Sequence, residues 1–563
     1  SSAASDVYKR QVIILSLLIS FMGASCEDWL YDNVNEDAAH EVLPQQVLPV
    51  VLFYSAQLQF DHAEYGAYLT QTLTTGGRNQ TSSFAYKSGW GDFLTMNRHP
   101  QWRRHFYDIG VNAKEIIDEA HEAQAWNLEL IGRTLRLMST QMTTDLFGDM
   151  PRSEAYESSS PHYDTQESIY EWMNQEIEEL IGMYEDPTYT EAATNIPIDQ
   201  SIDRVFAGDL NKWKHYTYAL KARLLLRKLP NWENNAATCQ AIITAVNRAL
   251  EGWEDVLYRF DGGNGAQNSP WGEAFGSTEQ GGLGWEGRGN MLNSAVPTKY
   301  FMENILGVFE SHNNLKGWAE DPRILAFMSA RPGPSGTSDS GTEMRYLDTN
   351  IGMDVSYKVD NYPTLFPEVD GKKVSVYTQN TGYVPLFLEE ELLLIKAEAT
   401  YWSGDKPTAR SLTMQAAEIN FDRFNLSSIY GSSYTRYRNN YLGNETGTGN
   451  YVTTYFPADG FNIGHIMRQK YVCLYLQPEQ WTDMRRYNYS CEENGIQYDN
   501  TYVYPGLKRP NNIYEAHWGD DPKAWINRIN YDPETEEKYN KAELERLGAY
   551  KNYQWLRKPM IWQ

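Results

Sequence analysis

Residues 128–151 read LELIGRTLRLMSTQMTTDLFGDMP and predict a helix with a well-marked end. The apolar residues of this stretch are Leu128, Ile131, Leu135, Met138, Met142 and Leu146. They recur at steps of three or four, which places them on one side of a helix with 3.6 residues per turn. Gly148 can adopt the left-handed conformation that closes a helix, and Pro151 has no amide hydrogen with which to continue one. The stretch therefore predicts one amphipathic helix that packs on a core.

Two aspartates, Asp145 and Asp149, lie at the C-terminal end of this predicted helix. Carboxylates there face the negative end of the helix dipole, so each needs a compensating partner. They are either catalytic or structural. Because the helix is one of several similar ones, we expect both aspartates to bond backbone amides or a basic neighbour.

The same apolar step of three or four recurs along the rest of the chain. It predicts helices over residues 44–75, 102–125, 126–147, 169–184, 210–229, 239–253, 297–309, 388–402, 407–421, 465–475 and 478–487. Short connections between them predict antiparallel helix pairs, which is how helical-repeat scaffolds stack. No strict repeat period is present. The sequence predicts a mostly α fold built from helix pairs.

The composition restricts the class of ligand. The 563 residues carry a formal net charge of -25 and a sequence pI of about 4.9. Nucleic-acid binding depends on basic surfaces that release counterions from phosphates, so we expect no nucleic-acid partner. Aromatic residues make up 13% of the chain, and planar rings pack well against sugar faces and hydrophobic partners.

The N-terminal region has the order of an export signal. Lys9 and Arg10 precede an apolar run over residues 12–22, and small residues lead to Cys26. The run is too short to span a bilayer permanently. The cysteine in this position resembles that of a bacterial lipoprotein signal, in which the thiol is acylated.

This interpretation divides the chain into three parts. Residues 1–25 are a signal peptide whose first residues look truncated or non-native, residues 26–43 are a lipidated tether, and residues 44–563 form a single domain. Glu27 and Asp28 resemble the acidic signal that directs lipoproteins of Bacteroidetes-type bacteria to the cell surface. We therefore expect a protein anchored at the outer surface of the outer membrane.

Long irregular regions rich in Gly, Asn and aromatic residues cover residues 76–100, 259–289 and 331–376. Loops of this length in compact domains are usually functional or disordered, and the aromatic residues disfavour disorder. Two interpretations remain, a ligand-binding platform and peripheral packing. For a platform, the tryptophans would be exposed and the polar residues would hydrogen-bond sugar hydroxyls. The predicted ligand-binding residues are Arg78, Asn79, Trp90, Asp92, Trp271, Trp285, Arg288 and Tyr346.

The motifs that would indicate an enzyme or a metal site are incomplete or lie in the wrong context. The G-x-G-x-x-G string at residues 282–287 follows no hydrophobic strand, and the His121-Glu122 pair has Ala125 where a zinc protease has its second histidine. Paired carboxylates are the serious catalytic option, since glycoside hydrolysis needs an acid and a base or nucleophile. Each such pair also has a structural explanation. We predict no catalytic residue and no metal ligand.

Several stretches, taken in order, resemble the SusD/RagB family. They are DLFGDMP at 145–151, YDTQESIY at 163–170, WKHYTYALKARLL at 213–225, LLLIKAEA at 392–399, RQKYVCLY at 468–475, WTDMRR at 481–486 and KPMIW at 558–562. The resemblance covers nearly the whole chain after Cys26.

The resemblance implies a fold and a function. The fold is mostly α-helical, with tetratricopeptide-like helix pairs that support a loop-rich ligand-binding half. Such a protein captures oligosaccharide at the cell surface and delivers it to a SusC-like, TonB-dependent outer-membrane transporter. The resemblance implies neither hydrolysis nor a cofactor. Two alternatives stay open, a peptide-capturing member of the same family and an anchored all-α glycoside hydrolase.

Overall fold

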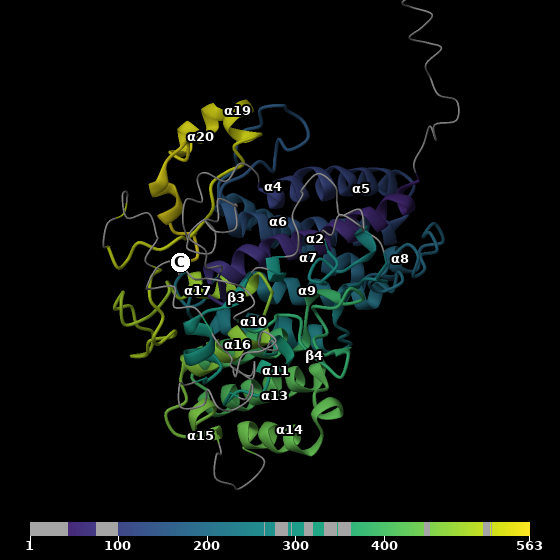
Figure 1. The fold of residues 1–563 in the computed structure, drawn as a ribbon. Helices are drawn as coiled ribbons and strands as arrows, with labels where there is room; N and C mark the ends of the chain where they lie inside the picture. The colour runs from purple at the N-terminus through teal and green to yellow at the C-terminus, as the bar shows by residue number, and fades with distance from the viewer. Residues whose placement is uncertain are drawn as a thin grey trace, which may run out of the picture.

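The computed structural model describes residues 43–74, 99–263, 265–275, 291–293, 295–308, 319–330, 346, 362–443, 451–510, 518 and 521–563. Within these ranges the chain is mostly helical, and its strands form three two-stranded sheets (Figure 1). The prediction of a mostly α fold is confirmed.

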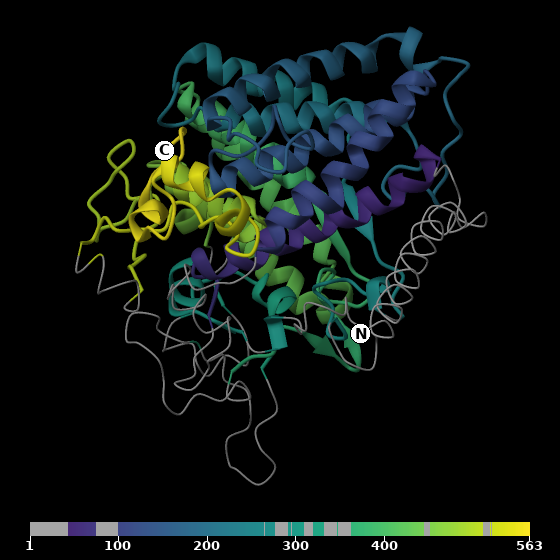
Figure 2. The same cartoon turned by 90° about the horizontal axis from the view of Figure 1, so that it is seen from above.

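Helix pairs form the scaffold. In each pair a short connection joins two helices that pack along one another (Figures 1 and 2). The pairs are α5 (Asn112–Glu122) with α6 (Trp126–Phe147), α9 (Leu210–Leu226) with α10 (Ala236–Leu250), and α12 (Glu389–Trp402) with α13 (Lys406–Phe424). Helix α7 (Gln166–Glu185) packs against both α6 and α9, which links the first two pairs. This is the tetratricopeptide-like arrangement that the family resemblance implies.

Helix α2 (Pro44–Leu69) runs through the middle of the molecule (Figures 1 and 2). Every residue from Ser55 to Leu69 is buried, because α2 touches α5, α6, α17 and strand β6. The other helical elements are α4 (Pro100–Arg103), η2 (Arg104–Val111), α8 (Pro187–Thr190), η3 (Gly265–Gln267), η5 (Met291–Asn293), η6 (Tyr300–Ile305), α11 (Ile324–Phe327), α14 (Ser427–Leu442), α15 (Val452–Tyr455), α16 (Ile463–Cys473), α17 (Glu479–Arg486), α19 (Glu536–Tyr539), α20 (Lys541–Leu547) and η9 (Tyr553–Arg557).

The described strands are short and pair in antiparallel fashion. They are β1 (Leu73–Thr74) with β3 (Val296–Pro297), β2 (Val256–Arg259) with β6 (Tyr383–Phe387), and β4 (Glu368–Val369) with β5 (Lys372–Lys373). Runs of two to five residues are too short for a reliable alternating pattern, and the sequence predicts none of them.

Helix α6 ends at the predicted residue, although Gly148, with ψ of -122°, is not in the left-handed helical conformation. The helix ends at Phe147, and Gly148 follows with φ of 86°. Asp149 accepts a hydrogen bond from the backbone amide of Gln166 (N to Oδ1, 3.0 Å), at the start of α7. The Tyr531 hydroxyl donates to the Asp149 carbonyl (2.6 Å). Asp149 therefore fixes how the chain leaves α6, and its predicted structural role is confirmed.

Asp209 caps the N-terminus of α9. Its carboxylate accepts from the backbone amides of Asn211 (3.0 Å) and Lys212 (3.2 Å). Replacing Asp209 with Ala should lower the free energy of unfolding by about 1 kcal/mol, because two amides of the first turn lose their acceptor. Urea denaturation followed by circular dichroism measures the loss. Asp209→Asn is the control and should retain most of the stability, and an equal loss in both variants would contradict the capping role.

Candidate functional site

The β1–β3 sheet brings together two of the regions in which the sequence predicts ligand-binding residues. Leu73 pairs with Pro297 and Thr74 pairs with Val296. Residues 75–98 follow β1 directly, and residues 276–290 end just before Met291, which precedes β3. Both regions therefore connect to the same small sheet. Six predicted residues, Arg78, Asn79, Trp90, Asp92, Trp285 and Arg288, belong to these two regions and lie outside the described residues.

Buried hydroxyl and amide groups attach this sheet to the helical scaffold. The Thr72 hydroxyl donates to the Tyr471 hydroxyl of α16 (2.8 Å), and it lies 3.0 Å from Oε1 of Gln480 in α17. The Thr298 amide donates to the Thr72 carbonyl (3.3 Å). The side chains of Thr72, Thr298, Tyr471 and Gln480 are all buried. The base of the two regions is therefore fixed by polar contacts to α16 and α17.

Tyr346 contacts η6, the helical turn that follows β3 in the chain. Its hydroxyl donates to the carboxylate of Glu303, which belongs to η6 a few residues after β3. The ring is partly buried against the core. Glu303 is a partner that the sequence analysis missed, because an acid within a predicted helix gives no sign that a tyrosine from another region will reach it.

Trp271 differs from its prediction. The Gly and Asn residues around it predict an exposed side chain, but Trp271 is only 1% exposed. Its ring packs edge-to-face on Phe60 of α2, with ring centroids 4.6 Å apart. The backbone around it is held by Asn380, whose carbonyl accepts from Ser269 N (2.8 Å) and whose side chain accepts from Ala274 N (3.0 Å). The expected exposure is wrong, and this tryptophan belongs to the core.

A buried cluster of charges lies between α6, α9 and α17. Nε of Arg227 donates to Oδ2 of Asp145 (2.9 Å), and its Nη2 donates to Oε1 of Glu479 (2.6 Å). Asp145 also accepts from the Tyr170 hydroxyl and from Nε1 of Trp562 (3.1 Å). Asp145 thus has the basic neighbour that the sequence predicts for it. Its role is to join helices that are distant in the sequence.

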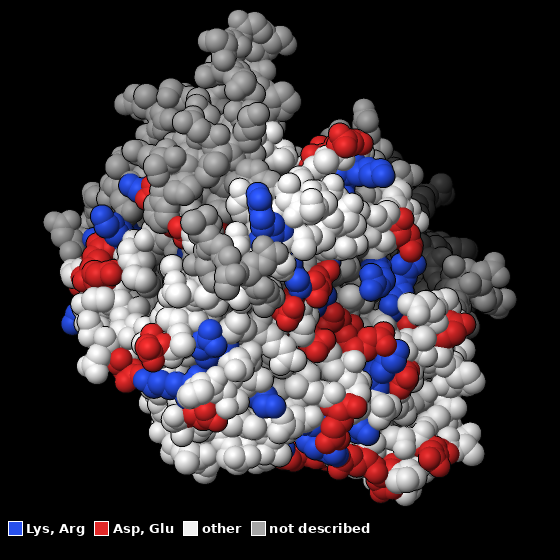
Figure 3. Space-filling model, turned by 90° about the horizontal axis from the view of Figure 1, so that it is seen from below, with Lys and Arg blue, Asp and Glu red and all other residues white. Residues whose placement is uncertain are grey.

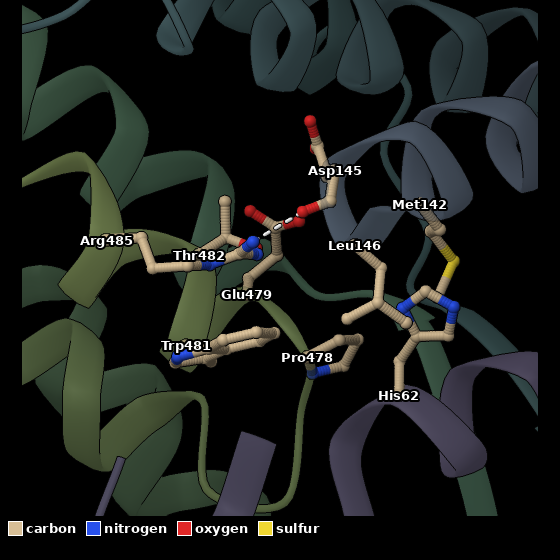
Figure 4. Close-up of a pocket in the computed structure, with 9 residues that line it drawn as sticks. All are labelled: His62, Met142, Asp145, Leu146, Pro478, Glu479, Trp481, Thr482 and Arg485. Atoms are coloured by element: carbon tan, nitrogen blue, oxygen red, sulfur yellow. Dashed lines mark hydrogen bonds between the residues drawn. The ribbon is translucent and has the colours of Figure 1, made fainter. Parts of the chain in front are cut away.

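A small cavity borders this cluster. It is lined by His62, Met142, Asp145, Leu146, Pro478, Glu479, Trp481, Thr482 and Arg485 (Figure 4). Figure 4 shows the Arg485 guanidinium turned to the backbone oxygen of Asp145, to which it donates a hydrogen bond. The cavity volume is about 10 Å³, which is room for about one water molecule. A sugar ring does not fit there.

The chemistry of these carboxylates does not suit glycoside hydrolysis. Burial would raise the pKa of Glu479, but the charges of Arg227 and Arg223 outweigh burial and lower this pKa to about 2. A general acid needs a pKa that is raised toward the working pH. Glu479 therefore stays ionised and bound to arginine.

A model of the family described as "Starch-binding associating with outer membrane" matches residues 44–504. This chain belongs to that SusD-like family. A comparison with curated proteins finds no match.

Solved structures share the SusD-like fold over nearly the whole chain. A chitin-binding SusD homolog from Flavobacterium johnsoniae is 15% identical with a TM-score of 0.61, and the alignment covers 92% of this chain and 98% of that chain. A SusD homolog from Bacteroides uniformis is 16% identical with a TM-score of 0.62 and coverage of 93% and 99%. A SusD/RagB family protein from Bacteroides thetaiotaomicron is 16% identical with a TM-score of 0.57 and coverage of 93% and 99%. At these identities the likeness establishes the fold.

One face of the SusD-like protein carries mixed charges (Figure 3). On the face in Figure 3, acidic and basic side chains of the described residues are interspersed, without a continuous basic area. Such a surface offers little to a phosphate backbone. Among the described residues, no cluster of His, Cys, Asp and Glu is arranged to hold a metal ion. In the same part of the chain, no helix is both long enough and apolar enough to cross a bilayer.

Proposed function

We propose that this SusD-like protein is a non-catalytic lipoprotein of the cell surface that captures an oligosaccharide. The protein would be anchored in the outer membrane through acylated Cys26. It would deliver the glycan to a SusC-like, TonB-dependent transporter in the same membrane. The family description, which names starch binding and the outer membrane, supports this proposal. So does the chitin-binding homolog that shares the fold.

The proposed ligand site lies over the β1–β3 sheet. The observation that carries it is the pairing of Thr74 with Val296, because this contact connects two regions that are rich in aromatic and polar residues. In the proposed site Trp90 and Trp285 stack on sugar rings. Arg78, Asn79, Asp92 and Arg288 hydrogen-bond the hydroxyls, and Tyr346 borders the site beside Glu303.

Two other functions are weaker. An all-α glycoside hydrolase needs a carboxylic acid with a raised pKa, and beside the cavity the charges of Arg227 and Arg223 lower the pKa of Glu479 instead. A peptide-capturing member of the family would use the same loops, and a ligand screen separates it from a glycan-binding member.

Replacing Trp90 or Trp285 with Ala should weaken oligosaccharide binding about tenfold, or about 1.4 kcal/mol, because a stacking surface is lost. Isothermal titration calorimetry with starch and chitin oligosaccharides measures the dissociation constant, and a digest of peptides is titrated in parallel. Trp232→Ala is the matched control, since Trp232 is 43% exposed on the α9–α10 connection.

Three results would contradict the proposal. Unchanged binding in both Trp90→Ala and Trp285→Ala would mean that the site is elsewhere. Binding of peptides but not oligosaccharides would support the peptide-capturing alternative. Shortening of the oligosaccharide during incubation, read from its reducing ends, would indicate a hydrolase.

A further inference from the structure

A group of buried hydroxyl and amide side chains lies where α2 ends and the β1–β3 sheet begins. We call it the threonine junction, and its members are Thr70, Gln71, Thr72, Thr298, Tyr471 and Gln480. Each of these residues is at most 2% exposed, so their polar atoms must find hydrogen-bond partners within the protein. They come from the turn after α2, the residue after β3, α16 and α17. The junction therefore joins segments that are distant in the sequence.

Thr72 attaches the start of β1 to the helical scaffold. Its hydroxyl donates to the Tyr471 hydroxyl (2.8 Å), which in turn donates to the Thr70 carbonyl (3.0 Å). The Thr72 hydroxyl also lies 3.0 Å from Oε1 of Gln480, whose Nε2 donates to the Tyr471 carbonyl (2.8 Å). A single hydroxyl group thus links β1 to both α16 and α17.

Thr298 attaches the end of β3 to the same junction. Its hydroxyl donates to the Gln71 carbonyl, and its amide donates to the Thr72 carbonyl (3.3 Å). Its hydroxyl oxygen also accepts from the amide of Phe301 in η6 (3.1 Å). The Phe301 ring packs against the Tyr471 ring, with ring centroids 6.0 Å apart. Both strands are therefore connected to Tyr471.

The β1–β3 sheet is too small to hold its own position. Each strand has two residues, and the register joins only Leu73 with Pro297 and Thr74 with Val296. Pro297 has no amide hydrogen to donate. Even longer two-stranded hairpins are at best marginally stable by themselves in water. The contacts of the threonine junction, together with burial of Leu73 and Val296, are therefore needed to keep the strands in place.

The backbone of Gln71 shows how closely the junction is constrained. Its φ is 59°, in the left-handed region that favours glycine. Its Nε2 donates to the Lys508 carbonyl (2.6 Å), and its own carbonyl accepts from the Thr298 hydroxyl. Residues in such conformations persist where surrounding contacts over-determine them, and they cluster at ligand sites. The direction of the chain after α2 is thus fixed by contacts from two other parts of the protein.

We propose that Thr72 and Tyr471 are positioning residues for ligand binding. Residues 75–98 continue from β1, and residues 276–290 lead through Met291 to β3, so the junction sets where the first region starts and where the second ends. Both side chains are buried and act through the strands. A site whose parts are already in place loses less conformational freedom on binding, which raises its affinity. The inference rests on the proposed function for the location of the ligand site.

Thr72→Val tests the proposal, because valine keeps the shape of threonine and removes only the hydroxyl. It should raise the dissociation constant for starch or chitin oligosaccharides about tenfold, measured by isothermal titration calorimetry. Thr72→Ser restores a hydroxyl and should bind nearly as tightly as the native protein. Tyr471→Phe breaks the same contact from α16 and should weaken binding in the same direction, so it replaces Thr72→Val if that variant does not fold.

Thr134→Val is the matched control. Thr134 is a fully buried threonine of α6, whose hydroxyl donates to the Leu130 carbonyl (2.9 Å) and lies 3.1 Å from the Tyr184 hydroxyl. Loss of a buried hydroxyl should lower the free energy of unfolding in both threonine variants, but only Thr72→Val should weaken binding. Native affinity in both Thr72→Val and Tyr471→Phe would overturn the proposal. So would equal weakening in Thr134→Val, which would indicate a general effect of lower stability.

Hydrogen exchange followed by mass spectrometry tests the junction without a ligand. The amides of residues 70–74 and 296–301 should exchange several-fold faster in Thr72→Val, while those of α5 and α6 should not change. Unchanged exchange at residues 296–301 would overturn the proposal, whether or not the native protein binds an oligosaccharide. Failure of the native protein to bind oligosaccharides contradicts the proposed function alone, and the variants are then titrated with the peptide digest. Trp90→Ala and Trp285→Ala test the location of the ligand site separately.

Discussion

Replacing Arg227 with Met should lower the free energy of unfolding by about 3 to 5 kcal/mol. Arg227 is fully buried and is bound by Asp145 and Glu479 at once. Methionine fills part of the space but leaves two carboxylates without their shared cation, and uncompensated buried charge is costly. Urea denaturation at neutral pH, followed by tryptophan fluorescence, measures the loss.

The loss of unfolding free energy in Arg227→Met should become smaller at low pH. In the native protein the pKa of Glu479 is lowered from 4.5 to about 2, so its ionisation stabilises the fold fully above pH 4.5. This contribution disappears as the pH falls from 4.5 toward 2. In Arg227→Met the lowering is smaller, because Arg223 remains but the largest favourable charge is gone, and protonation of Glu479 then relieves the buried charge. The difference in stability between the two proteins should therefore narrow as the pH falls through this window.

Arg248→Met is the matched control. Arg248 also pairs with two carboxylates, those of Glu185 and Glu251, but its side chain is 40% exposed. Exposed ion pairs contribute about 1 kcal/mol or less. Similar losses in Arg227→Met and Arg248→Met would contradict the stabilising role of the buried cluster.

Most helices could be predicted from the sequence, because their apolar periodicity and their end residues are local signals. The helix that ends before Gly148 is an example. Helix α14 was missed although Tyr430, Tyr434 and Tyr441 follow a helical spacing. Gly431 interrupts it with φ of 67°, and the glycine and serines around it obscure the pattern.

Contacts between distant segments could not be predicted. Nothing near Thr74 indicates that it pairs with Val296, and strands of two residues carry no periodicity. The error at Trp271 has the same origin. Its local surroundings suggest exposure, but Phe60 and Asn380 come from other parts of the chain and draw it into the core. The positions of Trp90 and Trp285 therefore stay predictions.

Replacing Trp562 with Ala should lower the free energy of unfolding by about 3 to 5 kcal/mol. Its side chain is fully buried, and its Nε1 donates to Oδ1 of Asp145 (3.1 Å). The Arg485 guanidinium lies between two tryptophans, 3.8 Å from the Trp481 ring and 5.2 Å from the Trp562 ring. Truncation would leave a cavity beside two buried charged groups.

Two further variants divide this loss into its causes. Trp562→Phe retains a buried ring but removes the donor to Asp145, so it should cost about 1 to 3 kcal/mol. Trp232→Ala removes a tryptophan that is 43% exposed and should cost much less than Trp562→Ala. If Trp562→Ala unfolded at the same urea concentration as the native protein, the C-terminal residues would contribute nothing to the scaffold. We expect the largest loss of stability in Trp562→Ala, because Trp562 joins α6 and α17 through its contacts with Asp145 and Arg485.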